Sequence, residues 1–273
     1  MGEGTPHLHL SQLPMVLAAS ETSQVTERTG IEYRRTSDGP LTMDLYEPAQ
    51  RPAGVLLPAV VLVAGYPDPG YEKLLGCKFK DTAMSSSWAR LAASWDLVAI
   101  TYTNRQPTED LDALLAHLRA NAAALGINAA RIGLWGLSGN GPLAMSALAR
   151  GPAGSFRCGV FSCAYLLDLD GETHVADAAK MWGFANPSPG ATVADLPPDL
   201  PLYIVRAGLE PDPGLNHAID SFVAAALARS LPITCVNYAG APHAFEIFHD
   251  TAQTREVIRG MLRFARFQLA GVM

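Results

Sequence analysis

Apolar and polar residues alternate in blocks along most of this chain, and the blocks predict alternating strands and helices. Leu41–Tyr46 alternates apolar and polar positions and is closed by Pro48, as expected for an antiparallel edge strand. Ala59–Val63 and Leu97–Tyr102 are continuous apolar runs rich in β-branched residues, a pattern typical of strands covered on both faces. Later runs have the same character: Ile132–Trp135, Gly159–Leu166, Leu202–Val205 and Thr234–Tyr238. We expect a mostly parallel sheet of about eight strands.

Stripes of apolar residues at helical spacing separate several of these strands. One helix is predicted from Pro107 to just before Gly126, and two more around Ile219–Leu227 and Val257–Ala265. This alternation indicates the α/β class, with helices on both faces of the sheet. Since such sheets bind ligands at the carboxyl ends of their strands, the chemistry should lie in the loops that follow strands.

Residues 31–273 are predicted to form a single domain, preceded by an N-terminal extension, residues 1–30, that could be mobile. Two stretches, residues 65–87 and 167–201, are too long for plain connectors and are expected to form small lid elements. The second carries Met181, Trp182 and Phe184, which either cover an apolar substrate pocket or simply cover core.

The strongest chemical signal is a serine in a glycine-rich turn between a strand and a helix. The sequence Gly-Leu-Ser-Gly-Asn-Gly, residues 136–141, follows the Ile132–Trp135 strand and precedes a helix through Leu143 and Leu148. Such a turn exposes the hydroxyl of Ser138, and the helix N-terminus favours negative charge that develops there. Asn140 stands where the Gly-x-Ser-x-Gly motif has its second glycine, and asparagine tolerates unusual backbone angles. The spacing fits neither a dinucleotide-binding loop nor a P-loop.

A histidine and two carboxylates follow later strands. His243 lies in the loop after the Thr234–Tyr238 strand, where it could act as the base for Ser138. The near rival, His249, is expected at the start of the final helix. The acid of a Ser-acid-His triad should follow the preceding strand, and that loop contains both Glu210 and Asp212. Glu210 is closer to the strand end and is narrowly favoured, but the sequence leaves both open.

An oxyanion formed during acyl transfer needs backbone N–H donors. Gly139 N–H should supply one donor, directly after the nucleophile. The loop after the Ala59–Val63 strand should supply the other, with Gly65 permitting the turn and Tyr66 N–H donating. Gly65 is also expected to border the substrate pocket, together with Met181, Trp182 and Phe184.

These motifs, in this order, resemble the dienelactone-hydrolase-like and acetyl-esterase-like branches of the α/β-hydrolase superfamily. The resemblance runs from about Leu41 to the C-terminus and rests on Gly-Tyr-Pro at 65–67, the Ser138 turn, Arg-Ala-Gly at 206–208 and Pro-His-Ala-Phe at 242–245. It implies an eight-stranded sheet and ester hydrolysis by Ser138 and His243, with no cofactor and no metal. Ala64 departs from the family, since many relatives have histidine there.

Composition excludes some partners and leaves others open. The 273 residues carry a net charge of −6, which argues against nucleic-acid binding, and no apolar run is long enough for a membrane span. Four separated cysteines form no metal motif, so we expect buried free thiols: Cys77, Cys158, Cys163 and Cys235. Leu13–Ser20 resembles a signal-peptide core, but no Lys or Arg precedes it, so the sequence favours a cytoplasmic protein over a secreted one.

The leading hypothesis is a serine carboxylesterase that acts on small-molecule esters with short to medium acyl chains. An amidase, a peptidase or an acyltransferase with the same triad is one alternative, and a catalytically silent fold that binds a small ligand is another. The natural substrate and the oligomeric state cannot be read from the sequence.

Overall fold

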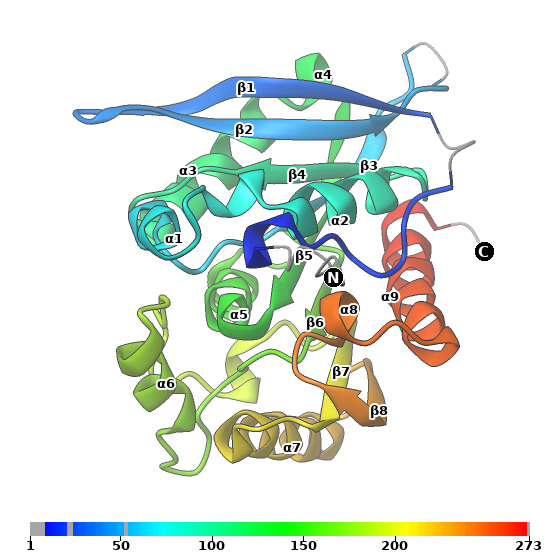
Figure 1. The fold of residues 1–273 in the computed structure, drawn as a ribbon. Helices are drawn as coiled ribbons and strands as arrows, with labels where there is room; N and C mark the ends of the chain where they lie inside the picture. Colours follow the sequence, from blue (N-terminus) through cyan, green and yellow to red (C-terminus); the bar gives the residue numbers. More distant parts are fainter. Residues whose placement is uncertain (1–8, 21–23, 52–53, 272–273) are drawn as a thin grey trace, which may run out of the picture.

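Eight strands form one sheet in the computed structural model, which describes residues 9–20, 24–51 and 54–271 (Figure 1). Their spatial order is β1-β2-β4-β3-β5-β6-β7-β8. The first three strands in this order pair antiparallel and the remainder pair parallel. The strand bounds are β1 Val25–Thr36, β2 Gly39–Pro48, β3 Leu57–Leu62, β4 Val98–Tyr102, β5 Ile127–Leu137, β6 Cys158–Ser162, β7 Leu202–Leu209 and β8 Ile233–Pro242.

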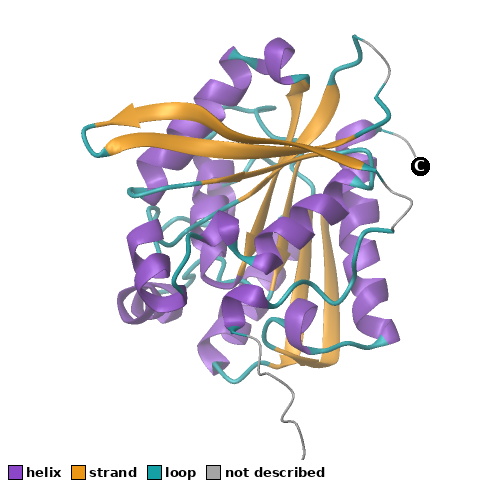
Figure 2. Ribbon diagram, turned by 45° about the horizontal axis from the view of Figure 1, so that its top comes forward, coloured by secondary structure: helices purple, strands orange, loops and turns teal. Residues whose placement is uncertain are grey.

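Helices cover both faces of this sheet (Figure 2). Helices α2 and α9 pack on one face, and α3, α5 and α7 pack on the other. Crossovers between parallel strands are right-handed, so the direction in which the chain moves along the sheet decides which face a connecting helix covers. The chain moves in one direction from β3 to β4 through α2, and in the opposite direction through α3, α5 and α7. The helix bounds are α1 Asp68–Leu75, α2 Ala83–Ala93, α3 Pro107–Ala120, α4 Ala122–Leu125, α5 Gly141–Arg150, α6 His174–Trp182, α7 Pro213–Ala228, α8 Phe245–Phe248 and α9 Ala252–Ala270.

The predicted α/β class and strand number are confirmed, and the central strands β3 to β6 are buried along most of their length. The predicted edge position of Leu41–Tyr46 is wrong. This segment lies within β2, which pairs with β1 on one side and β4 on the other. Strand β1 is not predicted by the apolar pattern, because most of its side chains are exposed or half-buried, as expected for an edge strand.

The expected extension overlaps the domain. Residues 25–30 belong to β1 and therefore to the sheet, while residues 1–8 and 21–23 lie outside the described residues. Met15 is buried, and its N–H donates to Ser87 Oγ at 2.9 Å. Met15 thus belongs to the hydrophobic core, and the preceding helical turn, Leu10–Gln12, packs against α2.

Three smaller expectations also differ from the structure. The predicted helix before Gly126 breaks at Asn121 into α3 and α4. His249 lies in the loop between α8 and α9 rather than in the final helix. All four cysteines are free, but only Cys158 and Cys163 are buried, whereas Cys77 is half-buried and Cys235 exposed. None of the helices in the described ranges has both the length and the apolar character that a membrane span requires.

Candidate active site

Ser138 lies at the tip of a tight turn between β5 and α5. Its backbone φ is +51°, a left-handed conformation that a serine rarely adopts. The turn is closed by close backbone packing, since a Cβ added to Gly141 would lie 2.1 Å from the Tyr165 carbonyl oxygen. Glycine at 141 is thus what lets α5 begin directly beneath the serine.

Asn140 does not adopt the unusual backbone conformation that its place in the turn suggested. Its φ of −84° and ψ of −11° are ordinary helical angles, so the unusual conformation in this turn belongs to Ser138. The Asn140 side chain instead accepts a hydrogen bond from Gly65 N–H at 2.7 Å. It therefore ties the loop after β3 to the serine turn.

Strand register brings the histidine and one carboxylate together. Leu209 of β7 pairs with Pro242 of β8, so the residues that follow them, Glu210 and His243, emerge side by side at the carboxyl edge of the sheet. Ser138 leaves the same edge after β5. This is the edge at which open α/β sheets bind ligands.

The three side chains form a continuous hydrogen-bonded chain. Ser138 Oγ lies 2.9 Å from His243 Nε2, and His243 Nδ1 lies 2.5 Å from Glu210 Oε2. Burial alone would lower the pKa of His243, but the hydrogen bond and negative charge of Glu210 raise it, and the charges of Glu246 and Asp212 add to that effect. The imidazole can accept a proton from the serine while Glu210 fixes its orientation.

Asp212, the other predicted acid, has different partners. One of its oxygens accepts a hydrogen bond from the Tyr165 hydroxyl, and the other caps α7 by accepting from Gly214 N–H at 2.8 Å. Its own N–H donates to Glu210 Oε1 at 3.1 Å. Asp212 thus supports Glu210 rather than contacting the imidazole.

The two predicted oxyanion donors lie on adjacent segments. A Cβ added to Gly65 would lie 2.9 Å from the Gly139 carbonyl oxygen, and one added to Gly139 would lie 2.3 Å from the Tyr66 hydroxyl. The Tyr66 ring contacts Tyr71 and Phe184 edge-on and thereby holds the loop in place. The backbone around Tyr66 and Gly139 therefore borders the space above Ser138.

A cavity of about 550 Å³ opens above Ser138 and His243. Its walls are mainly apolar and come from the N-terminal segment, α1, α2, the end of α6 and α8. The lining side chains around Ser138, His243 and Tyr66 include Leu10, Met15, Tyr71, Leu74, Phe79, Met84, Trp182, Ile247 and Phe248. Such a space fits an apolar small molecule.

Of the four predicted pocket residues, only Trp182 lines this cavity. Met181 points away with 74% of its surface exposed, because it lies on the outer face of α6. Phe184 is buried, stacked on Tyr165 and against Tyr66, and Gly65 lies below the serine turn. Phe184 and Gly65 therefore support the site without lining it.

The cavity wall also contains a buried carboxylate that was not predicted from the sequence. Glu246 lies three residues after His243 and accepts a hydrogen bond from the Ser162 hydroxyl. Burial raises the pKa of Glu246. Its signal in the sequence is one acidic residue inside the otherwise apolar run Ala-Phe-Glu-Ile-Phe.

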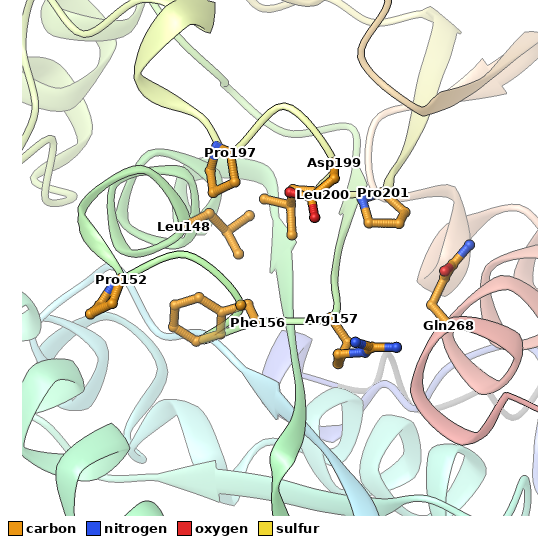
Figure 3. A pocket seen from close by; sticks show the side chains of 10 residues that line it. Leu148, Pro152, Phe156, Arg157, Pro197, Asp199, Leu200, Pro201 and Gln268 are labelled. Atoms are coloured by element: carbon orange, nitrogen blue, oxygen red, sulfur yellow. The ribbon is translucent and has the colours of Figure 1, made fainter.

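A second hollow, of about 270 Å³, lies at the opposite edge of the sheet (Figure 3). It is bordered by Phe156 and Arg157 before β6, by Leu200 and Pro201 before β7, and by Gln268 of α9. These positions are at the amino ends of the strands, so the hollow lies away from Ser138 and His243.

Comparison with known proteins yields structural neighbours only. No family model and no curated protein matches the chain. An esterase structure from Rhizomucor miehei is 17% identical with a TM-score of 0.68, over 95% of this chain and 86% of that one. A Pyrobaculum calidifontis esterase is 19% identical with a TM-score of 0.65, over 89% and 85%.

A third neighbour is brefeldin A esterase, described as a bacterial homologue of human hormone-sensitive lipase. It is 16% identical with a TM-score of 0.66, over 93% of this chain and 79% of that one. None of these three is described as a dienelactone hydrolase, so of the two predicted branches the dienelactone-hydrolase-like one is not confirmed. The sheet order, the covering helices and these similarities place the chain among proteins of the α/β-hydrolase fold.

Proposed function

We propose that this protein hydrolyses carboxylic esters of small apolar molecules through an acyl-enzyme intermediate on Ser138. The observation that carries the proposal is the hydrogen-bonded chain from Ser138 Oγ through His243 to Glu210, at the floor of an apolar cavity. The fold neighbours named above, all described as esterases, support the choice of esters over other acyl compounds.

The reaction has two halves. His243 Nε2 takes the proton of Ser138 as the oxygen attacks the ester carbonyl, and the same nitrogen then protonates the leaving alcohol. Glu210 holds Nδ1–H and stabilises the imidazolium that forms in between. The N–H groups of Gly139 and Tyr66 are assigned to the oxyanion of the tetrahedral intermediate. Water, activated by His243, releases the acid in the second half.

The cavity volume suits acyl chains of short to medium length. The apolar side chains on its walls, among them Met15, Phe79 and Met84, offer contacts to hydrocarbon and few hydrogen-bond partners. We therefore assign the cavity to the acyl group and the open rim to the alcohol. The cytoplasmic location expected from the sequence stays a prediction.

Replacement of the nucleophile tests this function directly. Ser138→Ala should reduce kcat on p-nitrophenyl acetate and butyrate by about 10⁴- to 10⁶-fold, because the triad acts as a unit. Ser86→Ala is a matched control, since its hydroxyl donates to the carbonyls of Thr82 and Ala83 at the start of α2. Wild-type protein without activity on such esters, or full activity in Ser138→Ala, would contradict the proposal.

A further inference from the structure

Two histidines and one glutamate meet on the surface where α6 packs against α7. Glu172 lies in the loop before α6, His174 is the first residue of α6, and His217 lies in the second turn of α7. All three are exposed or half-buried. The reaction proposed above uses none of them.

The ligand atoms of these three residues lie close together. His174 Nε2 lies 3.1 Å from Glu172 Oε2, and His217 Nε2 lies 3.7 Å from Glu172 Oε1. One atom from each of the three residues can be chosen so that all lie within 4.8 Å of one another. Each imidazole thus points its Nε2 atom at a different oxygen of the Glu172 carboxylate.

The local fold prepares this arrangement. A Cβ on Gly214 would lie 3.1 Å from His174 Nδ1, so glycine in the first turn of α7 makes room for the imidazole. Neither α6 nor α7 needs Glu172 to cap its N-terminus. Asp168 accepts hydrogen bonds from the N–H groups of Val175 and Ala176, and Asp212 accepts one from Gly214.

We propose that Glu172, His174 and His217 bind a divalent transition-metal ion of the zinc class. Zinc takes imidazole nitrogen and carboxylate oxygen at about 2.0–2.2 Å, which places neighbouring ligand atoms roughly 3.3 Å apart in a tetrahedral site. The nitrogen–oxygen distances of 3.1 Å and 3.7 Å, one to each oxygen of Glu172, lie on either side of that spacing. Ligand atoms that are up to 4.8 Å apart would move closer together when the ion binds. Two imidazoles disfavour Mg²⁺ and Ca²⁺, which prefer oxygen ligands, and solvent exposure leaves the fourth position to water.

Such an ion would cross-link two helices that border the active site. Helix α6 ends at Trp182 in the cavity wall, and α7 begins directly after the loop that carries Glu210 and Asp212. The ion would therefore stabilise the folded protein and fix the position of the cavity wall. It takes no part in acyl transfer.

Calorimetric titration of the full-length, chelator-treated protein with ZnCl₂ tests this site. Wild type should bind one equivalent that the double variant H174A/H217A lacks, and zinc should raise the Tm of wild type only. The variant Glu172→Gln should weaken binding by more than about tenfold, since even groups that merely orient metal ligands contribute 10- to 100-fold to affinity. His117→Ala, on α3, is the matched control and should bind like wild type.

Three results would overturn the proposal. The first is that wild type shows no heat of zinc binding at any concentration up to millimolar. The second is that wild type and the double variant bind zinc equally well. The third is that wild type binds Mg²⁺ as tightly as zinc and that the double variant loses this Mg²⁺ binding. The Tm of each protein without metal shows that the variants are folded. None of these readouts uses ester hydrolysis, so failure here is distinguishable from failure of the proposed esterase function.

Discussion

At the scale of single residues, the two carboxylates after β7 have separate partners. Glu210 accepts the hydrogen bond of His243 Nδ1, and Asp212 accepts those of Tyr165 and Gly214. Glu210→Gln should therefore reduce kcat by about 10³- to 10⁴-fold on p-nitrophenyl acetate, because the amide favours the wrong imidazole tautomer. The matched variant Asp212→Asn should keep most activity, since asparagine caps a helix as well as aspartate does. The reverse ranking of the two variants would show that the acid is misassigned.

Glu246 offers a second test at this scale, through the pH profile. His243 must be neutral to accept the serine proton, so kcat/KM should fall as the pH decreases through its pKa, which lies above the usual value of about 6.5. The charge of Glu246 is one cause of that raised pKa. Glu246→Gln should therefore move the acid limb of the profile to lower pH. Glu256→Gln, an exposed carboxylate on α9, should leave it unchanged; equal profiles for wild type and Glu246→Gln would contradict the electrostatic assignment.

At the scale of elements, the turn from β5 into α5 depends on glycine at 141. Gly141→Ala should destabilise the protein by about 1–3 kcal/mol, because the new methyl group meets backbone that cannot move aside. Gly70→Ala in α1 is the control, since a Cβ there meets nothing within 4 Å and should stabilise by about 0.4–1 kcal/mol. Urea unfolding of both variants gives the two free energies. Equal stability of Gly141→Ala and wild type would refute the close packing.

The same elements show what the sequence can and cannot predict. Strands β3 and β4 can be predicted from the sequence, because burial on both faces requires a continuous apolar run. The edge strand β1 cannot be predicted in this way, because only Tyr33 among its twelve residues is buried. Ser138 and His243 could be identified because each directly follows a predicted strand. The choice of Glu210 over Asp212 depends instead on the pairing of Leu209 with Pro242 and on the register shift just before that pair. Local patterns do not specify register across a parallel pair.

At the scale of the whole molecule, the cavity is assembled from segments far apart along the chain. Leu10 and Phe248 belong to the N-terminal segment and to α8, and Leu74 and Trp182 belong to α1 and α6, which lie in the two long stretches between strands. Side chains from so many segments converge only through tertiary packing, which one sequence does not reveal. This is why the reacting groups can be predicted from the sequence, whereas of the four residues assigned to the substrate pocket only Trp182 lines the cavity.

This assembly predicts how acyl-chain preference changes. Leu10→Ala should raise KM for p-nitrophenyl octanoate roughly fivefold, from the loss of about 1 kcal/mol of apolar contact, and leave the acetate ester unaffected. Leu227→Ala removes another exposed leucine side chain, on α7 and outside the cavity, and should change neither value. If both leucine variants behave alike, the N-terminal segment is not part of the acyl site.

The central claim is that His243 activates Ser138 as the nucleophile. The most direct measurement is mass-spectrometric mapping of the adduct formed with a fluorophosphonate probe, in wild type and in His243→Ala. We predict one adduct on the peptide that carries Ser138, formed rapidly in wild type and much more slowly in the histidine variant. An adduct on another residue, such as Ser162, or equal labelling rates in the two proteins, would contradict the account.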